Sequence, residues 1–401
     1  MDFITDFLFG LSSRTMVPPH LITKESADLM TAFNELQAAA STRIRIGSNW
    51  PLFEIFSDRM KHPKRVVDAY TMPIVQSALN EKRSSNILPG DDDSSTRSLL
   101  EYLVSRTDGK FPFSEPCNLS LPYAKDSTLI RDTLLAFLLA GRDTSASLLT
   151  FVTYALALYP DVYQRLEAEI NETAGGDESI SIDNVKHMRY LRAIINETLR
   201  LFPPVPFNIR RSTDVPSILP SLLSHIPGGL YMYPRCSVTF SPLHIHRRKD
   251  LWGDDAEEFK PERWLLENPT KVHVANPFAF IPFNGGPRMC LGQNLAYLLA
   301  SQTIARMVRR YTWTLSPAHQ PAMVPDKWKG EPGRKGVEQC WPKAALTLYS
   351  DRGLFVIVQK KGEAKAKAEQ IGVHEKSATI FPYAFNQKTG RRQSPSSSLL
   401  V

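Results

Sequence analysis

The feature that most constrains the fold is a long apolar stretch, residues 134–159, whose only charges lie in Gly141-Arg142-Asp143-Thr144-Ser145. Such a run is too apolar for a surface helix, and charges at its middle would be costly inside a bilayer. We therefore predict a helix over about 124–158 that runs through the centre of a core. The chain has 401 residues, 42% of them apolar, which is enough to build a large core.

Helical periodicity also marks most of the first 310 residues. Apolar residues recur near a helical period from residue 1 to about 85, so we predict helices there. The cluster Pro89-Gly90-Asp91-Asp92-Asp93 then predicts an exposed loop. Further helices are predicted over about 98–106, 160–173, 183–201 and 293–310.

The pattern changes after residue 200, where many of the 30 prolines gather. Short runs such as Tyr231-Met232-Tyr233 and Ser237-Val238-Thr239-Phe240 predict strands of small sheets. Residues 345–358 predict a closing hairpin around Asp351-Arg352-Gly353. The expected fold class is therefore mainly α, of the α+β type, with a helical lobe and small β-sheets.

Charge and cysteine usage exclude several classes of protein. The formal charge of +7 is spread along the chain and much of it lies beyond residue 360, so no nucleic-acid partner is indicated. The four cysteines lack the spacing of a zinc site or a disulfide framework, which favours a reducing compartment. The N-terminus has no long apolar stretch, so we expect no signal peptide or membrane anchor there. Residues 359–401 are expected to form a disordered tail.

The most specific motif is Phe283-Asn284-Gly285-Gly286-Pro287-Arg288-Met289-Cys290-Leu291-Gly292, a loop just before a predicted helix. Backbone N–H groups at a helix N-terminus favour a thiolate, and glycines let a flat cofactor approach the backbone. Cys290 is therefore a candidate metal ligand. A lone cysteine would by default be a small buried hydrophobe, and the surrounding motif is what favours the ligand.

This loop resembles the signature F-x-x-G-x-R-x-C-x-G of the cytochromes P-450, with Phe283, Gly286, Arg288, Cys290 and Gly292 at its fixed positions. The resemblance implies a cytochrome P-450 domain over residues 1–358 and a haem b whose iron is axially ligated by Cys290. It also implies that Phe283 packs beneath the loop, that Gly286 belongs to the cofactor-binding residues, and that Arg288 pairs with a propionate.

A second motif, Ala140-Gly141-Arg142-Asp143-Thr144, resembles the oxygen-binding segment of that family. Glycine and a hydroxyl can open the hydrogen-bond ladder of a helix and leave room for dioxygen and water. Asp143 and Thr144 would then be catalytic residues that relay protons. The alternative is an ordinary threonine whose hydroxyl bonds back to the helix.

A third pair of segments, Glu197-Thr198-Leu199-Arg200 and Pro261-Glu262-Arg263-Trp264, resembles the Glu-Arg-Arg network of the family, which is structural. A buried carboxylate shared by two guanidiniums is tolerable only when its hydrogen bonds are satisfied. Glu197 and Arg200 alone would instead be a solvated pair three residues apart.

Two further residues follow from the same comparison. Arg210 resembles the second propionate-binding arginine, although Arg211 is adjacent and could serve instead. His246 could bind a metal, but a structural use is the more common fate of such a histidine.

Several segments look most similar to the fungal branch that hydroxylates n-alkanes and fatty acids, namely residues 2–10, 32–37, 140–145 and 283–293. The resemblance implies insertion of one oxygen atom from O2 into an aliphatic C–H bond of an apolar small molecule. It implies NADPH-cytochrome P-450 reductase as the electron donor and the cytosolic face of the endoplasmic reticulum membrane as the location. Two alternatives stay open: a tailoring oxidase of fungal secondary metabolite or toxin biosynthesis, and a truncated remnant without function.

The chain departs from the family pattern in two places. It begins at a point that resembles the interior of a full-length member, so the membrane helix, the first strands and the helix with Trp-x-x-x-Arg are expected to be missing. Residues 212–236 are longer than the corresponding turn of the family. Cys236 stands where the family has glycine, and a positive φ is expected to strain the backbone there.

Overall fold

The computed structural model describes residues 1–15, 17–84, 98–105, 127–175, 180–220, 228–265, 276–318, 340, 342–350, 353–361 and 378–379. These residues form two compact units, Met1–Asp143 and Thr144–Ala384, each with its own hydrophobic core. The fold is mainly helical with small antiparallel sheets, which confirms the predicted class. The predicted loop at residues 89–93 and nearly all of the predicted tail lie outside the described residues.

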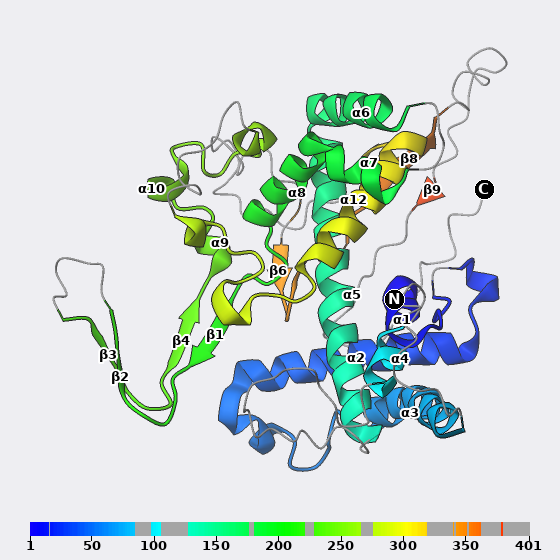
Figure 1. Ribbon diagram of the computed structural model, residues 1–401, viewed down its shortest axis with the longest axis vertical. Coiled ribbons are helices and arrows are strands. Elements are labelled where there is room, and N and C mark those ends of the chain that lie inside the picture. The colour runs from blue at the N-terminus through cyan, green and yellow to red at the C-terminus, as the bar shows by residue number, and fades with distance from the viewer. Residues whose placement is uncertain are drawn as a thin grey trace. The chain divides into compact units, whose positions relative to one another are not determined.

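The first unit consists of helices. They are α1 (Asp2–Phe9), α2 (Lys24–Ile46), α3 (Lys61–Ser84), α4 (Leu99–Ser105) and the first half of α5 (Ser127–Leu158), with 3₁₀ turns η1 (Pro19–Leu21) and η2 (Gly47–Phe53) (Figure 1). Thr23 begins α2 as a capping residue, because its hydroxyl accepts a hydrogen bond from the Ser26 N–H at 3.2 Å. Leu8, Phe33 and Leu134 are buried together and bring α1, α2 and α5 into one core.

Gly141 allows α1 to pack closely against α5. A Cβ atom at this position would lie 2.6 Å from Cδ1 of Ile4, which is closer than two carbon atoms can approach. The helix itself continues without a break through residues 140–144. The predicted opening of the helix at this motif is therefore wrong, and close packing accounts for the glycine.

The helix predicted over 124–158 is confirmed as α5, and it supplies apolar side chains to both cores. Leu134 and Leu138 belong to the core of the first unit, whereas Phe151 and Leu156 belong to the core of the second. Among the helices that the structure describes, α5 alone has the length and apolar composition to cross a membrane, a test that core helices also pass.

The second unit contains the rest of α5 and a set of helices around α8. These are α6 (Pro160–Ala174), α7 (Ile182–His187), α8 (Arg189–Leu201), α9 (Pro242–Ile245), α10 (Lys249–Trp252) and α12 (Gln293–Arg310), with 3₁₀ turns η5 (Pro261–Trp264), η6 (Pro277–Ala279) and η7 (Gly286–Arg288). Most of α8 is buried, and the Phe202 ring that follows it stacks on Phe151 of α5 at 4.5 Å.

The single helix predicted over 183–201 is divided into α7 and α8. Ser181 and Asn184 form a capping box that begins α7. The start of α8 is capped from another helix, because the Glu169 carboxylate of α6 accepts the N–H groups of Tyr190 and Leu191 at 2.7 and 2.9 Å. A cap supplied from a distant position leaves no local signal in the sequence.

The strands form four small antiparallel sheets within the described part of the chain. The pairs are β1 (Asn208–Arg211) with β4 (Ser237–Phe240), β2 (Ser217–Leu219) with β3 (Leu230–Met232), β6 (Pro342–Ala344) with β7 (Leu348–Ser350), and β5 (Tyr311–Leu315) with β8 (Val356–Lys360), which also pairs with β9 (Ala378–Thr379). Four residues of the predicted tail are thus paired in this sheet, namely Gln359 and Lys360 of β8 and Ala378 and Thr379 of β9.

The predicted hairpin over 345–358 is wrong. Its two halves pair with other strands, β7 with β6 and β8 with β5, and not with each other. The pairing of β8 with β5 places Val356 opposite Leu315 and Val358 opposite Trp313. Val356 and Trp313 are buried in the main core, so burial outweighs the shorter connection.

Between residues 212 and 236, where the chain is longer than the family pattern, the strands β2 and β3 pair as a two-stranded ribbon (Figure 1). The positive φ expected at Cys236 falls instead on Arg235, whose φ is 55°. The Arg235 N–H donates to the Thr213 carbonyl at 3.0 Å, and its Nε donates to Asp214 at 2.6 Å. These two contacts hold the residue in the left-handed conformation, so the expectation for Cys236 is corrected.

Candidate functional site

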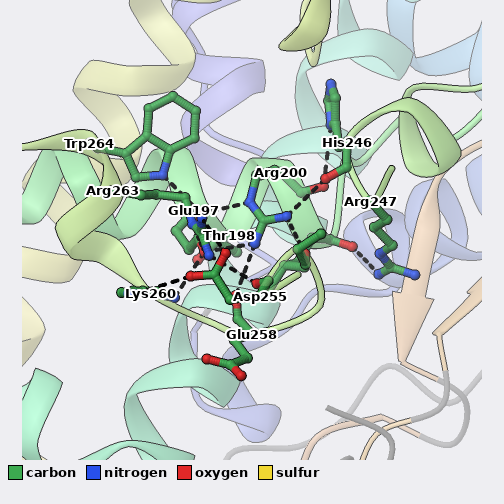
Figure 2. Close-up of polar contacts among 12 residues, drawn as sticks. Glu197, Thr198, Arg200, His246, Arg247, Asp255, Glu258, Lys260, Arg263 and Trp264 are labelled. Atoms are coloured by element: carbon green, nitrogen blue, oxygen red, sulfur yellow. Dashed lines mark hydrogen bonds and ion pairs between the residues drawn. The ribbon is translucent and has the colours of Figure 1, made fainter. Parts of the chain in front are cut away.

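Glu197 lies at the centre of a buried polar cluster (Figure 2). The side chains of Glu197 and Arg200 have no exposed area, and that of Arg263 is 2% exposed. Arg200 binds the carboxylate in a bidentate manner, with Nε and Nη2 each 2.8 Å from an oxygen. Arg263 Nε adds a third contact at 2.9 Å. The structure therefore brings the three residues together in the interior, and Glu197 and Arg200 are not a solvated pair.

Two further donors complete the shell of the Glu197 carboxylate. The Trp264 Nε1–H donates to Oε2 at 2.9 Å, and the Lys260 backbone N–H donates to Oε1 at 2.9 Å. A carboxylate has about four lone-pair sites, so its accepting capacity is filled. The sequence motifs predict neither donor, although the position of Trp264 directly after Arg263 is a local signal for one of them.

The remaining donors of Arg200 fasten a loop-rich segment to α8. Nη1 donates to the carbonyl oxygens of His246 and Ala256 at 2.8 and 2.5 Å, and Nη2 donates to that of Glu258 at 2.9 Å. A planar guanidinium presents five N–H donors in a fixed fork, which suits it to bind a carboxylate and several carbonyls at once. The segment from 246 to 258 is thereby held by one side chain.

Asp255 balances the charge of the cluster. Burial opposes ionisation of this carboxyl, but the hydrogen bond from Lys260 and the charge of Arg263 outweigh it and lower the pKa of Asp255. Arg263 contacts Asp255 through Nη1 at 3.4 Å and donates from Nη2 to its carbonyl at 3.1 Å. The negative charges of two carboxylates thus balance the positive charges of the two buried guanidiniums.

His246 is buried beside this cluster and connects it to the chain that leads to Cys290. Its Nε2 accepts the Ile281 N–H at 2.9 Å, and its Nδ1 lies 3.2 Å from the Arg200 carbonyl oxygen. Its ring is also 5.3 Å from that of Phe280. Both ring nitrogens are occupied by backbone groups, so the predicted structural use of His246 agrees with its surroundings.

The loop that carries Cys290 is closed by its own backbone hydrogen bonds. The Cys290 N–H donates to the Phe283 carbonyl at 2.9 Å, and the Met289 N–H donates to the Gly286 carbonyl at 3.0 Å. Asn284 and Gly286 have φ values of 63° and 68°, which turn the chain sharply. Cys290 is exposed and lies three residues before the start of α12, as the motif predicts.

Phe283 anchors the other side of this loop. Its ring lies 5.2 Å from that of Tyr297 on α12, and the Tyr297 hydroxyl donates to Asn196 of α8 at 2.8 Å. The Arg192 guanidinium lies over the Tyr297 ring at 3.3 Å. Phe283 therefore packs on the helix that follows the loop, and that helix is bonded to the one that carries Glu197.

The residues around Cys290 fit a haem. Its apolar neighbours Met289 and Leu291 are 54% and 89% exposed, so they offer surface that a flat apolar ring could cover. Gly286 has no atom within 4 Å of the place of a Cβ, which leaves room beside the backbone. Among the described residues, no group of three or more His, Cys, Asp or Glu side chains could hold a metal directly. The exposed Cys290 thiol beside this apolar surface could serve as the axial ligand of a haem iron.

The arginines predicted to hold propionates are both exposed. Arg288 lies at the end of η7, two residues before Cys290. Arg210 lies on β1, where its Nη1 donates to the Ile209 carbonyl at 3.1 Å. The adjacent Arg211 donates from Nε to the Arg235 carbonyl at 3.3 Å. The Arg210 guanidinium also lies 5.6 Å from the centre of the Phe240 ring. None of these contacts selects between Arg210 and Arg211, so the choice stays a prediction.

The predicted proton-relay residues lie on α5, where the two units meet in the sequence. Asp143 accepts a hydrogen bond from Gln37 Nε2 of α2 at 2.5 Å, and Arg142 Nε is 3.5 Å from its other oxygen. Thr144 is the first residue of the second unit, which also contains Cys290. Their roles in proton transfer stay predictions.

Comparisons with known proteins identify the family of the chain. The sequence pattern of the family described as Cytochrome P450 matches residues 1–334. "Cytochrome P450 52E1" of Candida apicola is 32% identical over 327 residues, which cover 78% of this chain and 57% of that protein. "Cytochrome P450 monooxygenase fsdH" of Fusarium heterosporum is 31% identical over 361 residues, which cover 90% of this chain and 57% of that protein.

The chain belongs to the cytochrome P450 family, because the family pattern matches well over half of its residues. Its relatives include fungal proteins of the P450 52 group, such as "Cytochrome P450 52A6" of Candida tropicalis, which is 30% identical over 89% of this chain. The matched parts span 57% to 62% of the length of these three relatives.

Replacing Glu197 by glutamine should strongly destabilise the second unit. The change keeps the size of the side chain but leaves two buried guanidiniums without their carboxylate, which costs about 3–5 kcal/mol in comparable buried pairs. Urea unfolding of Glu197→Gln and wild type measures this loss. Glu258→Gln is the matched control, because its side chain is exposed, and a similar loss in both variants would contradict the buried role of Glu197.

His246 should make stability depend on pH below neutrality. Burial, followed by the charge of Arg200, lowers the pKa of His246 from 6.5 to about 3. Between these values the unfolded chain binds a proton that the folded chain does not, so the free energy of unfolding falls as the pH is lowered. His246→Gln should make this slope shallower by up to about 1.4 kcal/mol per pH unit. If the free energies of unfolding of the two chains, measured in urea, changed with pH in parallel, His246 would not be the titrating group.

Proposed function

We propose that this chain is a haem-thiolate monooxygenase that inserts one oxygen atom of O2 into an aliphatic C–H bond of an apolar substrate. The observation that carries the proposal is the exposed Cys290 thiol, on a closed loop before α12 that is joined to the buried Glu197 cluster. The reaction consumes two electrons and two protons per turnover, and the second oxygen atom leaves as water.

The residues of the chain would hold the haem and its protons in place. When bound, the haem supplies the activation of O2, and a thiolate ligand favours O–O cleavage. Cys290 Sγ is proposed as the axial ligand, and the guanidiniums of Arg288 and Arg210 as partners of the propionates. Thr144 Oγ1 would donate a proton in the haem pocket. The Asp143 carboxylate would take up a proton from solvent and pass it on to Thr144 Oγ1. Glu197, Arg200 and Arg263 would hold the segments that surround the loop in fixed positions.

An n-alkane or a fatty acid is the proposed substrate. The support is the resemblance of residues 32–37 and 140–145 to the fungal branch that oxidises such molecules, together with relatives of the P450 52 group. A tailoring oxidase of secondary metabolism is the second candidate. Its support is the similarity of the chain to fungal monooxygenases not named as members of the P450 52 group, over 90% of this chain in one case. The two differ in substrate, not in the proposed chemistry.

NADPH-cytochrome P-450 reductase is the proposed electron donor, and the cytosolic face of the endoplasmic reticulum membrane is the proposed location. Both follow from membership of the family and from the resemblance to its fungal branch. The basic character of the chain, with a formal charge of +7, suits an acidic redox partner.

Cys290→Ser should abolish the thiolate signature of the haem. The reduced, CO-bound protein should show the red-shifted band of a thiolate-ligated haem, and the serine variant should lose it because a neutral hydroxyl donates far less charge to iron. Cys236→Ser is the control, since Cys236 lies on the turn before β4, and it should keep the band. Wild-type protein that binds no haem would instead support a remnant without function.

Incubation with a fatty acid or an n-alkane should distinguish the two enzyme hypotheses. With NADPH, a fungal cytochrome P-450 reductase and ¹⁸O2, an alkane or fatty-acid hydroxylase should give an alcohol that carries one ¹⁸O atom, detected by mass spectrometry. Haem-bound protein with the thiolate band that oxidises neither class of substrate would contradict the lipid assignment and favour the tailoring oxidase.

A further inference from the structure

His246 occupies a position between the buried cluster and the loop that carries Cys290. Its side chain has no exposed area, and its two ring nitrogens face backbone groups of different segments. The Ile281 N–H can only donate, so Nε2 must be the acceptor and Nδ1 must carry the proton. Nδ1–H then donates to the Arg200 carbonyl at 3.2 Å. The surroundings thus select one tautomer of the neutral ring.

Ile281 begins a short series of backbone hydrogen bonds that ends at Cys290. Its carbonyl accepts the Asn284 N–H at 3.1 Å, where the chain turns with a φ of 63°. The carbonyl of Phe283 then accepts the Cys290 N–H at 2.9 Å. The N–H of Ile281 has no partner in this series, and His246 supplies its acceptor. One attachment of the loop to α8 therefore runs through the imidazole of His246.

We propose that His246 is a positioning residue that fixes the loop from Ile281 to Cys290 through the acceptor at Nε2. The His246 ring also packs against Phe280, with 5.3 Å between the ring centres. If this packing were its only role, any ring of similar size could replace it. This role of His246 in the loop does not depend on whether Cys290 binds haem iron.

Three variants separate the acceptor from the rest of the side chain. His246→Gln can place an amide oxygen near the position of Nε2, so it can still accept from Ile281. His246→Asn reaches only the position of Nδ1, and His246→Phe keeps a ring without either nitrogen. His244→Gln is the control, because His244 is exposed on the neighbouring helix α9.

Hydrogen exchange of the full chain, followed by mass spectrometry, measures the effect on peptides covering residues 276–290 and 189–201. His246→Asn and His246→Phe should raise exchange in the loop peptide about fivefold or more, because a buried N–H loses its acceptor. His246→Gln and His244→Gln should stay within about twofold of wild type. Equal effects of His246→Gln and His246→Asn, or an equal rise in the α8 peptide, would overturn the proposal.

The tautomer can be read in the wild-type chain, so the proposal does not depend on variants that fold. Long-range ¹H–¹⁵N spectra of ¹⁵N-histidine-labelled protein should show a ring protonated at Nδ1 only, and this signal should be absent from His246→Gln. A ring protonated at Nε2 could not accept the Ile281 N–H. Such a spectrum for His246 would overturn the proposal.

Discussion

The second unit depends on a carboxylate that has no exposed area and is shared by two guanidiniums. Removing one charge from water costs several kcal/mol, so Glu197 is stable in the interior only because every lone pair finds a donor. Those donors come from α8 itself and from the segment Lys260–Trp264, whose donors lie 63 to 67 residues after Glu197 in the sequence. The hydrogen bonds that the Glu197 carboxylate must accept therefore fix the positions of these segments.

The same constraint reaches the loop that carries Cys290. Arg200 uses the donors that Glu197 leaves free to bind three backbone carbonyls, one of which belongs to His246. His246 bonds to Ile281, and Asn196 of α8 bonds to Tyr297 beneath Phe283. The loop is thus attached to α8 on two sides. A thiol that must meet a metal in one geometry requires such a rigid support.

The sequence predicted the parts of this arrangement whose chemistry is local. The Gly-rich motif around Cys290 and most helix positions follow from spacing and residue type. The buried network of Glu197 with Arg200 and Arg263 follows from the resemblance to the family. What it could not predict comes from contacts between distant residues. Glu169 caps α8 from another helix, β8 pairs with β5 because both contribute to one core, and Gly141 makes room for Ile4. The partner of His246 is likewise a backbone group 35 residues away.

The central claim is that Cys290 binds iron through its sulfur. Resonance Raman spectra of the ferric, haem-reconstituted full chain test this most directly when the cysteines are labelled with ³⁴S. An iron–sulfur stretching band that moves to lower frequency in the labelled protein, and that is absent from a chain without the Cys290 thiol, is the predicted result. Bound haem with no band sensitive to ³⁴S would contradict the account.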